Sequence, residues 1–142
     1  MGEARFGISL GRVEEMMSDN DQHERGLKLR TDMFGREAVE QRMNAFGEFG
    51  KPLQHIINAY AYGDVWSRTA LPLPTKSLVM VAMMAAAGHE KELSVHIQGA
   101  LKNGCTPAQI QEVLLLLALY CGIPAANEAH RIASDILREH TL

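Results

Sequence analysis

The segment GHEKELSVHIQGALKNGCTPAQIQEVLLLLALYCGIPAANEAHRIASDIL, residues 88–137, decides the fold of this chain, because three helices can be read from it. Residues 90–102 carry apolar side chains at helical spacing. Thr106 then opens the sequence TPAQ, a capping box with proline at the first helical position, which predicts a helix over 106–120. After a Gly-Ile-Pro corner, an alanine-rich helix is expected over 124–139, with small side chains that permit close packing.

The residues before this segment predict further helices. Residues 74–87 are largely apolar on all sides, as expected of a helix buried by its neighbours or by another subunit. Large apolar residues also recur at helical spacing over 46–63, where Pro52 favours a helix start and Gly63 favours a left-handed helix end. The prolines within residues 66–74 predict a connecting loop.

The amino-terminal part of the chain gives weaker signals. Residues 23–34 can form a short helix ended by Gly35, and 37–43 can add one or two helical turns. Residues 1–21 show no clear period, so we expect a mobile arm there and a single helical domain over 22–142. No strand signal competes with the helical ones. The expected fold is therefore an all-α, single-domain bundle of about six helices.

Composition and charge restrict the classes of protein to which the chain can belong. A hydrophobic content of 46% and a charged content of 22% are ordinary for one soluble domain. The net charge of -3 and the scattered basic residues argue against a nucleic-acid partner. No segment approaches the ~18 apolar residues of a membrane span, and the amino terminus lacks the apolar stretch of a signal peptide. We therefore expect a cytoplasmic protein with no membrane partner.

Two of the predicted helices carry acidic residues or histidine on otherwise apolar faces. Glu92 and His96 stand four residues apart and share a helix face, so the carboxylate can orient the imidazole and raise its pKa for proton transfer. The alternative for this pair is an exposed ion pair of little consequence. Glu112 belongs to a second stripe with Leu116 and Tyr120, where it is either a buried functional acid or a solvated residue near the helix start.

Metal and redox chemistry are not indicated by the sequence. His89 and His96 are seven residues apart, so the HExxH zinc motif is absent. Cys105 and Cys121 are too far apart for a CxxC pair, and we expect both to be reduced, structural thiols. His130 is expected to be packed or solvated rather than catalytic. We therefore expect no metal site.

Four stretches of the chain resemble the carboxymuconolactone decarboxylase family. They are YAYGDVWSR (60–68), HEKELSVHIQGALKNG (89–104), TPAQIQEVLLLLALYCG (106–122) and PAANEAHRIA (124–133). The resemblance extends over about residues 27–137. The YxxGDVWSR and YCGxPAANEA stretches resemble the 4-carboxymuconolactone decarboxylase branch. They do not resemble the alkylhydroperoxidase branch, whose members use a CxxC pair that is absent here.

This resemblance implies an alkylhydroperoxidase D-like, all-α fold that assembles as a homo-oligomer, commonly a trimer or a hexamer, with active sites near the subunit interfaces. It implies a lyase that needs no cofactor and acts on a small carboxylic acid or lactone. In the implied substrate the departing carboxylate is vinylogous to a lactone carbonyl. The electrons left by CO2 therefore enter a dienolate, which the enzyme must stabilise and protonate.

The resemblance also implies roles for particular residues. His96 is the expected proton donor, and Glu92 or Glu112 is the carboxylate that orients it. Arg68 is the expected cationic anchor for the substrate, and Lys76 is a weaker second anchor. Trp66 and Tyr120 are expected to shape the pocket.

Two departures from the branch leave three functions open. Leu116 occupies a position where the branch often has histidine, in the stretch EVLLH, and the loop over 71–76 is more apolar than the arginine-rich version typical of the branch. The chain is therefore a decarboxylase of the standard lactone, a decarboxylase of a more hydrophobic aromatic or polyketide-like acid, or a non-catalytic oligomeric binding protein.

Overall fold

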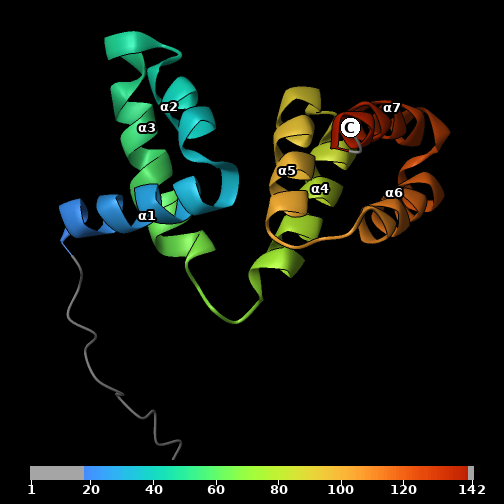
Figure 1. Ribbon diagram of the computed structural model, residues 1–142, viewed down its shortest axis with the longest axis horizontal. Coiled ribbons are helices and arrows are strands. Elements are labelled where there is room, and N and C mark those ends of the chain that lie inside the picture. The colour runs from blue at the N-terminus through green and yellow to red at the C-terminus, as the bar shows by residue number, and fades with distance from the viewer. Residues whose placement is uncertain (1–17, 141–142) are drawn as a thin grey trace, which may run out of the picture.

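The computed structural model describes residues 18–140, and its helices form two groups joined by a loop (Figure 1). The elements, with η1 a 3-10 helix and η2 a π-helix, are α1 (Asp19–Phe34), α2 (Arg36–Asn44), η1 (Gly47–Gly50), α3 (Lys51–Ile56), η2 (Ile57–Trp66), α4 (Leu73–Ala87), α5 (Glu90–Lys102), α6 (Pro107–Cys121) and α7 (Ile123–His140). No strand occurs within residues 18–140, so the prediction of an all-α fold is confirmed for this part of the chain.

The second group, α4 to α7, contains the main apolar core. Helix α4 packs against α5 and α6, and α7 packs against the same two helices. The predicted capping box is confirmed: the Thr106 hydroxyl accepts from the Gln109 N–H at 3.1 Å, and the Gln109 side chain accepts from the Thr106 N–H at 2.9 Å. The fully or almost fully buried side chains at the centre of this core are Val81, Leu93, Ile97, Ala100, Ile110, Leu114 and Ala129.

The first group is held together by a close crossing of α1 and η2, which two glycines permit. A Cβ atom on Gly26 would lie 1.6 Å from the carbonyl oxygen of Asn58. A Cβ atom on Gly63 would lie 2.3 Å from the carbonyl oxygen of Gln22. Each helix therefore places a glycine against the backbone of the other, and the two backbones touch where any side chain would separate them.

The predicted helix end at Gly63 is wrong. Gly63 is buried inside η2, which continues to Trp66, and it is not among the glycines with positive φ. The glycine is required by the close approach of α1 rather than by a left-handed turn. Trp66 consequently belongs to the last turn of a helix, although the sequence placed it in the connecting loop.

Helix α1 begins at Asp19, earlier than the expected residue 23, because the Ser18 hydroxyl accepts a hydrogen bond from the Asp21 N–H at 3.1 Å. The last residues of the expected arm over 1–21 are thus part of a helix. Its residues 1–17 lie outside the part of the chain that the structure describes.

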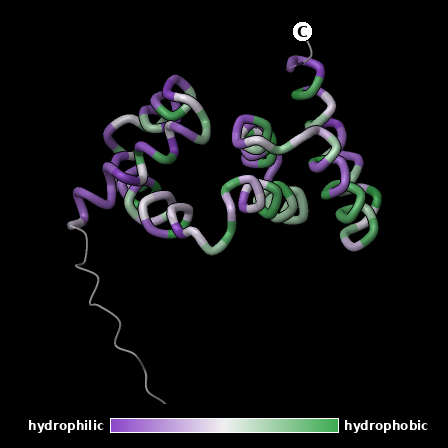
Figure 2. Tube along the Cα trace, turned by 60° about the horizontal axis from the view of Figure 1, so that its bottom comes forward, coloured by the Kyte–Doolittle hydropathy of each residue, from purple (hydrophilic) through white to green (hydrophobic). Residues whose placement is uncertain are grey.

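Hydrophobic residues are distributed unevenly between the two groups. The helices after the loop are more hydrophobic than the strongly hydrophilic α1 (Figure 2). Large apolar side chains are exposed on neighbouring parts of α4, α6 and the start of α7: Val79, Met83, Leu115, Leu116, Leu119, Tyr120 and Ile123. Within residues 18–140, no helix has both the length and the apolar character needed to cross a membrane.

The crossing of α1 and η2 generates a stability prediction. Gly26→Ala should lower the free energy of unfolding by about 3 kcal/mol or more, because backbone atoms of η2 must move to admit the methyl group. The control is Gly88→Ala, at a left-handed position with φ 75° and open space around the added Cβ, which should cost about 1–2 kcal/mol of backbone strain. Urea unfolding followed by circular dichroism measures both; equal losses would contradict the close crossing.

Candidate active site

A cavity of about 430 Å³ lies where the two helix groups meet, and His96 is one of its walls. We call it the His96 cavity. Its charged and polar lining comes from α1, α2, α3 and α5: Arg30, Arg42, Gln54, Glu92 and His96. Its apolar lining includes Phe46, Leu53, Ile57, Met80 and Val95. The predicted pair Glu92 and His96 is thus brought to one cavity, together with the predicted pocket residue Trp66.

Three parallel rings form one side of the His96 cavity. The ring of Trp66 is stacked between Tyr62 and His96, with centroid distances of 5.9 Å and 6.1 Å. The interplanar angle between Trp66 and His96 is 2°. Phe34 meets both Tyr62 and His96 edge-on, at 6.0 Å and 5.7 Å. These contacts fix the orientation of the imidazole by packing, which leaves its nitrogen atoms available for a ligand.

The ionisation of His96 follows from this burial. His96 is only 6% exposed, and the loss of water around the ring lowers the pKa of its imidazole. The carboxylate of Glu92 acts in the opposite direction, while the positive charge of Arg42 lowers the pKa of His96 further. The expectation that Glu92 raises this pKa is correct for that one interaction but wrong for the net shift. The effect of Glu92 on His96 is that of its charge, and no hydrogen bond joins the two side chains among the described residues.

Arg30 is a buried cation that the sequence analysis missed. It is only 4% exposed, and its Nη1 donates to the side-chain oxygens of Gln54 at 2.8 Å and Asn58 at 3.0 Å. Its guanidinium carbon lies 5.6 Å from the centre of the Tyr62 ring. Burial lowers the pKa of Arg30, although a guanidinium remains charged at neutral pH. A signal was present in the sequence: Gln54 and Asn58 are polar residues four apart in an otherwise apolar helical pattern.

Arg42 is the second cation of the His96 cavity that the sequence did not reveal. Its guanidinium lies 5.1 Å from the centre of the Phe34 ring, at the end of α2. Neither Arg42 nor Arg30 forms an ion pair with a residue that the structure describes. The cavity therefore holds two guanidinium groups and the single carboxylate of Glu92, a balance that favours an anionic ligand.

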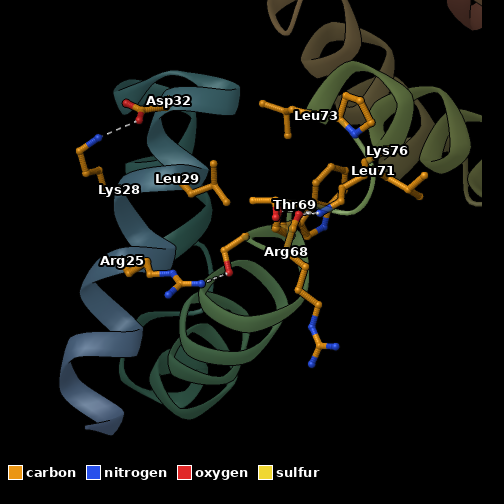
Figure 3. Close-up of a pocket in the computed structure, with 12 residues that line it drawn as sticks. Arg25, Lys28, Leu29, Asp32, Arg68, Thr69, Leu71, Leu73 and Lys76 are labelled. Carbon is orange, nitrogen blue, oxygen red and sulfur yellow. Dashed lines mark hydrogen bonds and ion pairs between the residues drawn. The ribbon is translucent and has the colours of Figure 1, made fainter. Parts of the chain in front are cut away.

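The predicted anchors Arg68 and Lys76 line a different pocket of about 430 Å³, between α1 and the connecting loop (Figure 3). Trp66 lines this pocket as well as the His96 cavity and separates the two. Arg68 is exposed and pairs with Asp64 at 3.1 Å. Its guanidinium extends away from the ion pair of Lys28 and Asp32 on α1.

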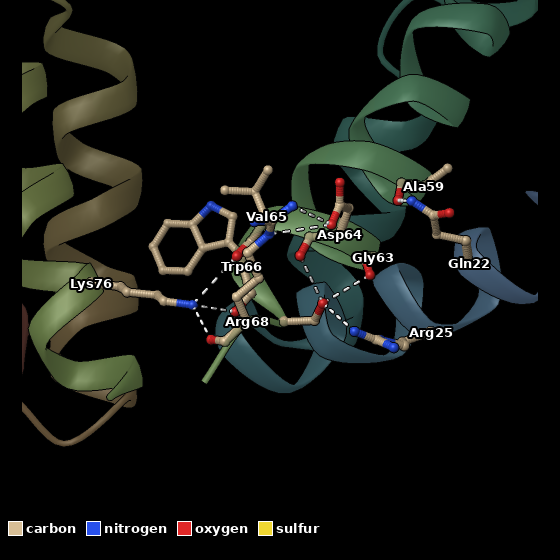
Figure 4. A network of polar contacts seen from close by, with 10 residues as sticks. Gln22, Arg25, Ala59, Gly63, Asp64, Val65, Trp66, Arg68 and Lys76 are labelled. Carbon is tan, nitrogen blue, oxygen red and sulfur yellow. Dashed lines mark hydrogen bonds and ion pairs between the residues drawn. The ribbon is translucent and has the colours of Figure 1, made fainter. Parts of the chain in front are cut away.

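Lys76 is engaged by the end of η2 (Figure 4). Its ammonium group donates to the carbonyl oxygen of Trp66 at 2.9 Å, to that of Val65 at 3.4 Å, and to that of Arg68. A cation in this place satisfies the free carbonyls of a helix end and opposes the negative end of its dipole. Lys76 thus fixes the helix that carries Trp66, and its three N–H donors are directed to the backbone.

The remaining predicted site residues lie on α6. Glu112 is exposed, and it does not line the His96 cavity. Tyr120 and Leu116 line an apolar groove of about 390 Å³ between α4 and α6. Leu116, at the position where the decarboxylase branch often has histidine, therefore does not line the His96 cavity of its own chain.

Other reactive side chains are dispersed. Cys105 is buried, its thiol donates to the carbonyl oxygen of Pro74 at 3.3 Å, and burial raises the pKa of this thiol. Cys121 is exposed, and the two cysteines are not joined. His130 is exposed and contacts the carbonyl oxygen of Ala126 on its own helix at 2.7 Å. Within residues 18–140, no three His, Cys, Asp or Glu side chains come together as a metal site would require.

Comparison with known proteins identifies the family of the chain. The sequence profile described as the carboxymuconolactone decarboxylase family matches residues 51–135. The chain belongs to the carboxymuconolactone decarboxylase family. It is 35% identical, over 87% of its length and 92% of the relative, to 4-carboxymuconolactone decarboxylase of Acinetobacter baylyi. It is 36% identical, over 80% of both chains, to nitrosuccinic acid decarboxylase of Metarhizium robertsii. Membership in this family and the two named relatives make the chain a carboxy-lyase, which sets the non-catalytic alternative aside.

The electrostatics of the His96 cavity can be tested by titration. We expect the pKa of His96, followed by ¹⁵N nuclear magnetic resonance, to lie below its ordinary value because burial disfavours the imidazolium. Glu92→Gln should lower this pKa further, since it removes a negative charge, and Arg42→Gln should raise it. Glu40→Gln, at an exposed carboxylate paired with Arg36, is the control and should leave the pKa unchanged. Shifts of the opposite sign would refute this account.

Proposed function

We propose that the chain catalyses cofactor-independent decarboxylation of a small carboxylic acid in the His96 cavity, with 4-carboxymuconolactone as the first candidate substrate. The observation that carries the proposal is the convergence of a buried imidazole and two guanidinium groups without ion-pair partners among the described residues. The guanidinium groups attract the anion, and the imidazole supplies the proton that replaces CO2.

The substrates named for the two relatives support a shared type of reaction. In a carboxymuconolactone the carbon that bears the departing carboxylate is joined through a C=C bond to the lactone carbonyl, and in nitrosuccinic acid one carboxyl group and the nitro group are on the same carbon. In both compounds the electron pair of the broken C–C bond can enter an acceptor already present in the substrate. Such a substrate needs no metal or organic cofactor as an electron sink, so the protein only has to bind it, stabilise the anion and deliver one proton.

The proposed mechanism uses the coupled charges of His96 and Arg42. In the free enzyme, burial and Arg42 keep the imidazole neutral at neutral pH. The negative charge of an anion bound beside Arg42 offsets the effect of the guanidinium on His96. The pKa of His96 therefore rises, and the ring takes a proton from solvent. The C–C bond then breaks, CO2 departs without the electron pair, and the dienolate forms. His96 transfers its proton to carbon and is protonated again from solvent, with Glu92 stabilising the imidazolium.

A more hydrophobic acid is the second candidate substrate. The apolar wall of the cavity includes Phe46 and Leu53, whose side chains are 61% and 48% exposed and can cover a ligand larger than a lactone. The loop over 71–76 lies at the neighbouring pocket rather than at this wall, so its apolar sequence says little about the substrate of the His96 cavity.

Turnover tests the proposed function. Purified protein freed of metal ions should release CO2 from freshly prepared 4-carboxymuconolactone, followed as loss of substrate absorbance. His96→Ala should lower kcat by about 10²–10⁴, because the protonation step loses its acid. His130→Ala is the matched control and should retain wild-type turnover, since His130 is exposed on α7. Wild-type rates in His96→Ala would refute the role of His96. No turnover by an intact assembly would favour the hydrophobic acid.

We also propose that the chain forms a homo-oligomer, a trimer or a hexamer, through the apolar surface of α4 and α6. The exposed apolar side chains of these helices flank the groove that Leu116 and Tyr120 line. A contiguous apolar surface of this kind is unusual on a monomer in water. Another subunit that covers it would remove Leu119 and Tyr120, 73% and 81% exposed, from solvent.

Light scattering tests this assembly. The wild-type protein should have the mass of a trimer or a hexamer, and Leu119→Asp should shift it to a smaller species by placing a charge in the contact. Glu112→Gln, on the same helix but at an exposed acidic position, is the control and should keep the wild-type mass. A monodisperse wild-type monomer would contradict the proposal.

A further inference from the structure

One edge of the Arg30 guanidinium has no partner among residues 18–140. All the hydrogen bonds that Arg30 makes to described residues come from Nη1, which donates to Gln54 and Asn58. Its Nε is buried and has no partner there. A buried N–H group without a partner is rare in folded proteins and calls for a ligand or a specific cause. Nε and Nη2 together form the side of a guanidinium that binds both oxygens of a carboxylate.

From this edge we infer that Arg30 binds the carboxylate that the substrate keeps when it releases CO2, and so determines the preference for acids with a second carboxyl group. The inference rests on the proposed function and adds a specificity-determining residue to it. Arg30 thereby takes the role of substrate anchor that the family resemblance implied for Arg68, which lies in the neighbouring pocket.

The charge balance around Arg30 supports a ligand carboxylate. No described carboxylate lies within ion-pair distance of Arg30, although the guanidinium is 4% exposed. Gln54 and Asn58 offer neutral oxygens, which orient the group without cancelling its charge. A buried cation is normally paired, because its removal from water is costly. The missing counter-ion is the charge that a second substrate carboxylate supplies.

The position of Arg30 in the cavity suits the carboxylate that the substrate keeps rather than the one released as CO2. Its guanidinium lies over the Tyr62 ring, Tyr62 stacks on Trp66, and Trp66 stacks on His96. The cation and the imidazole are thus at opposite ends of one series of ring contacts. A substrate held at the Arg30 end presents its reacting carbon toward His96, where the proton is required.

This arrangement discriminates against acids with one carboxyl group. A monoacid that places its carboxylate at the reacting position leaves the guanidinium edge empty, and a site built for a polar group rejects a ligand that lacks it. Lysine would not replace arginine here, because an ammonium group cannot bind both carboxylate oxygens in one plane.

The test uses stable compounds that keep only the retained carboxylate. The acids are (5-oxotetrahydrofuran-2-yl)acetate and 3-nitropropanoate, and each is compared with its methyl ester. Trp66 is the single tryptophan of the chain and lines the cavity, so its fluorescence reports binding. We expect the wild-type protein to bind at least one acid about tenfold or more tightly than its ester, as a charge-assisted pair of hydrogen bonds provides.

Three variants locate the binding group. Arg30→Lys should reduce the preference for acid over ester to within about twofold while leaving the affinity for the ester unchanged. A purely structural loss would weaken the ester as well. Arg36→Lys is the same chemical change at an exposed residue of α2 and should keep the preference. Loss of the preference in Arg68→Lys, with Arg30→Lys unaffected, would overturn the inference in favour of Arg68.

A measurement on the wild-type protein covers the case in which Arg30→Lys does not fold. The ¹Hε–¹⁵Nε resonance of Arg30 should shift when the preferred acid is added and stay in place with the ester, because Nε gains its hydrogen-bond partner from the carboxylate. No shift, or no acid that binds better than its ester, would overturn the inference. Turnover separates the two proposals. If the protein prefers acid over ester through Arg30 but does not release CO2, only the proposed function is contradicted. If it releases CO2 without this preference, only the inference is contradicted.

Discussion

The backbone contact between α1 and η2 is the constraint on which the rest of the site depends. The first helix group has only a small apolar core. Its two longest helical segments, α1 and η2, are held by direct backbone contact, which Gly26 and Gly63 permit. Arg30 follows Gly26 by about one turn of α1, so the contact places its guanidinium against the η2 side chains. Trp66 follows Gly63 by three residues and reaches the second group, where it meets His96. Wider spacing of the helices would separate the cation and the aromatic rings.

Burial has different consequences for the two ionisable groups that this constraint places in the cavity. It lowers the pKa of both Arg30 and His96. The guanidinium starts so far above neutrality that it stays charged, whereas the imidazole becomes neutral. The free cavity therefore carries more positive than negative charge, and its imidazole is neutral. In the proposed mechanism, a bound anion pairs with these cations and raises the pKa of His96, so binding of the substrate prepares the site for protonation.

The helices of both groups could largely be predicted from the sequence, but the contact that holds the first group together could not. Capping residues and apolar spacing act locally, so the Thr106 capping box and the bounds of α5 were visible in the chain itself. The function of Gly63 depends on α1, which lies far away in sequence, and a glycine near the end of an apolar pattern predicts a helix end equally well. Arg30 was missed for the same reason: its partners Gln54 and Asn58 come from another helix.

The placement of the site residues along the chain bears on how this family can act on different acids. His96, Glu92 and Trp66 lie inside the matched region, residues 51–135, whereas Arg30 and Arg42 precede it. The proposed proton donor and the Trp66 ring stacked on it thus belong to the matched region, whereas Phe34 and the two cations of the cavity come from helices outside it. Under the proposed function, substitutions at Arg30 and Arg42 would alter which anion is bound while the Trp66 ring stays stacked on His96. Relatives named for a lactone and for a nitro acid are what such a division of roles would produce.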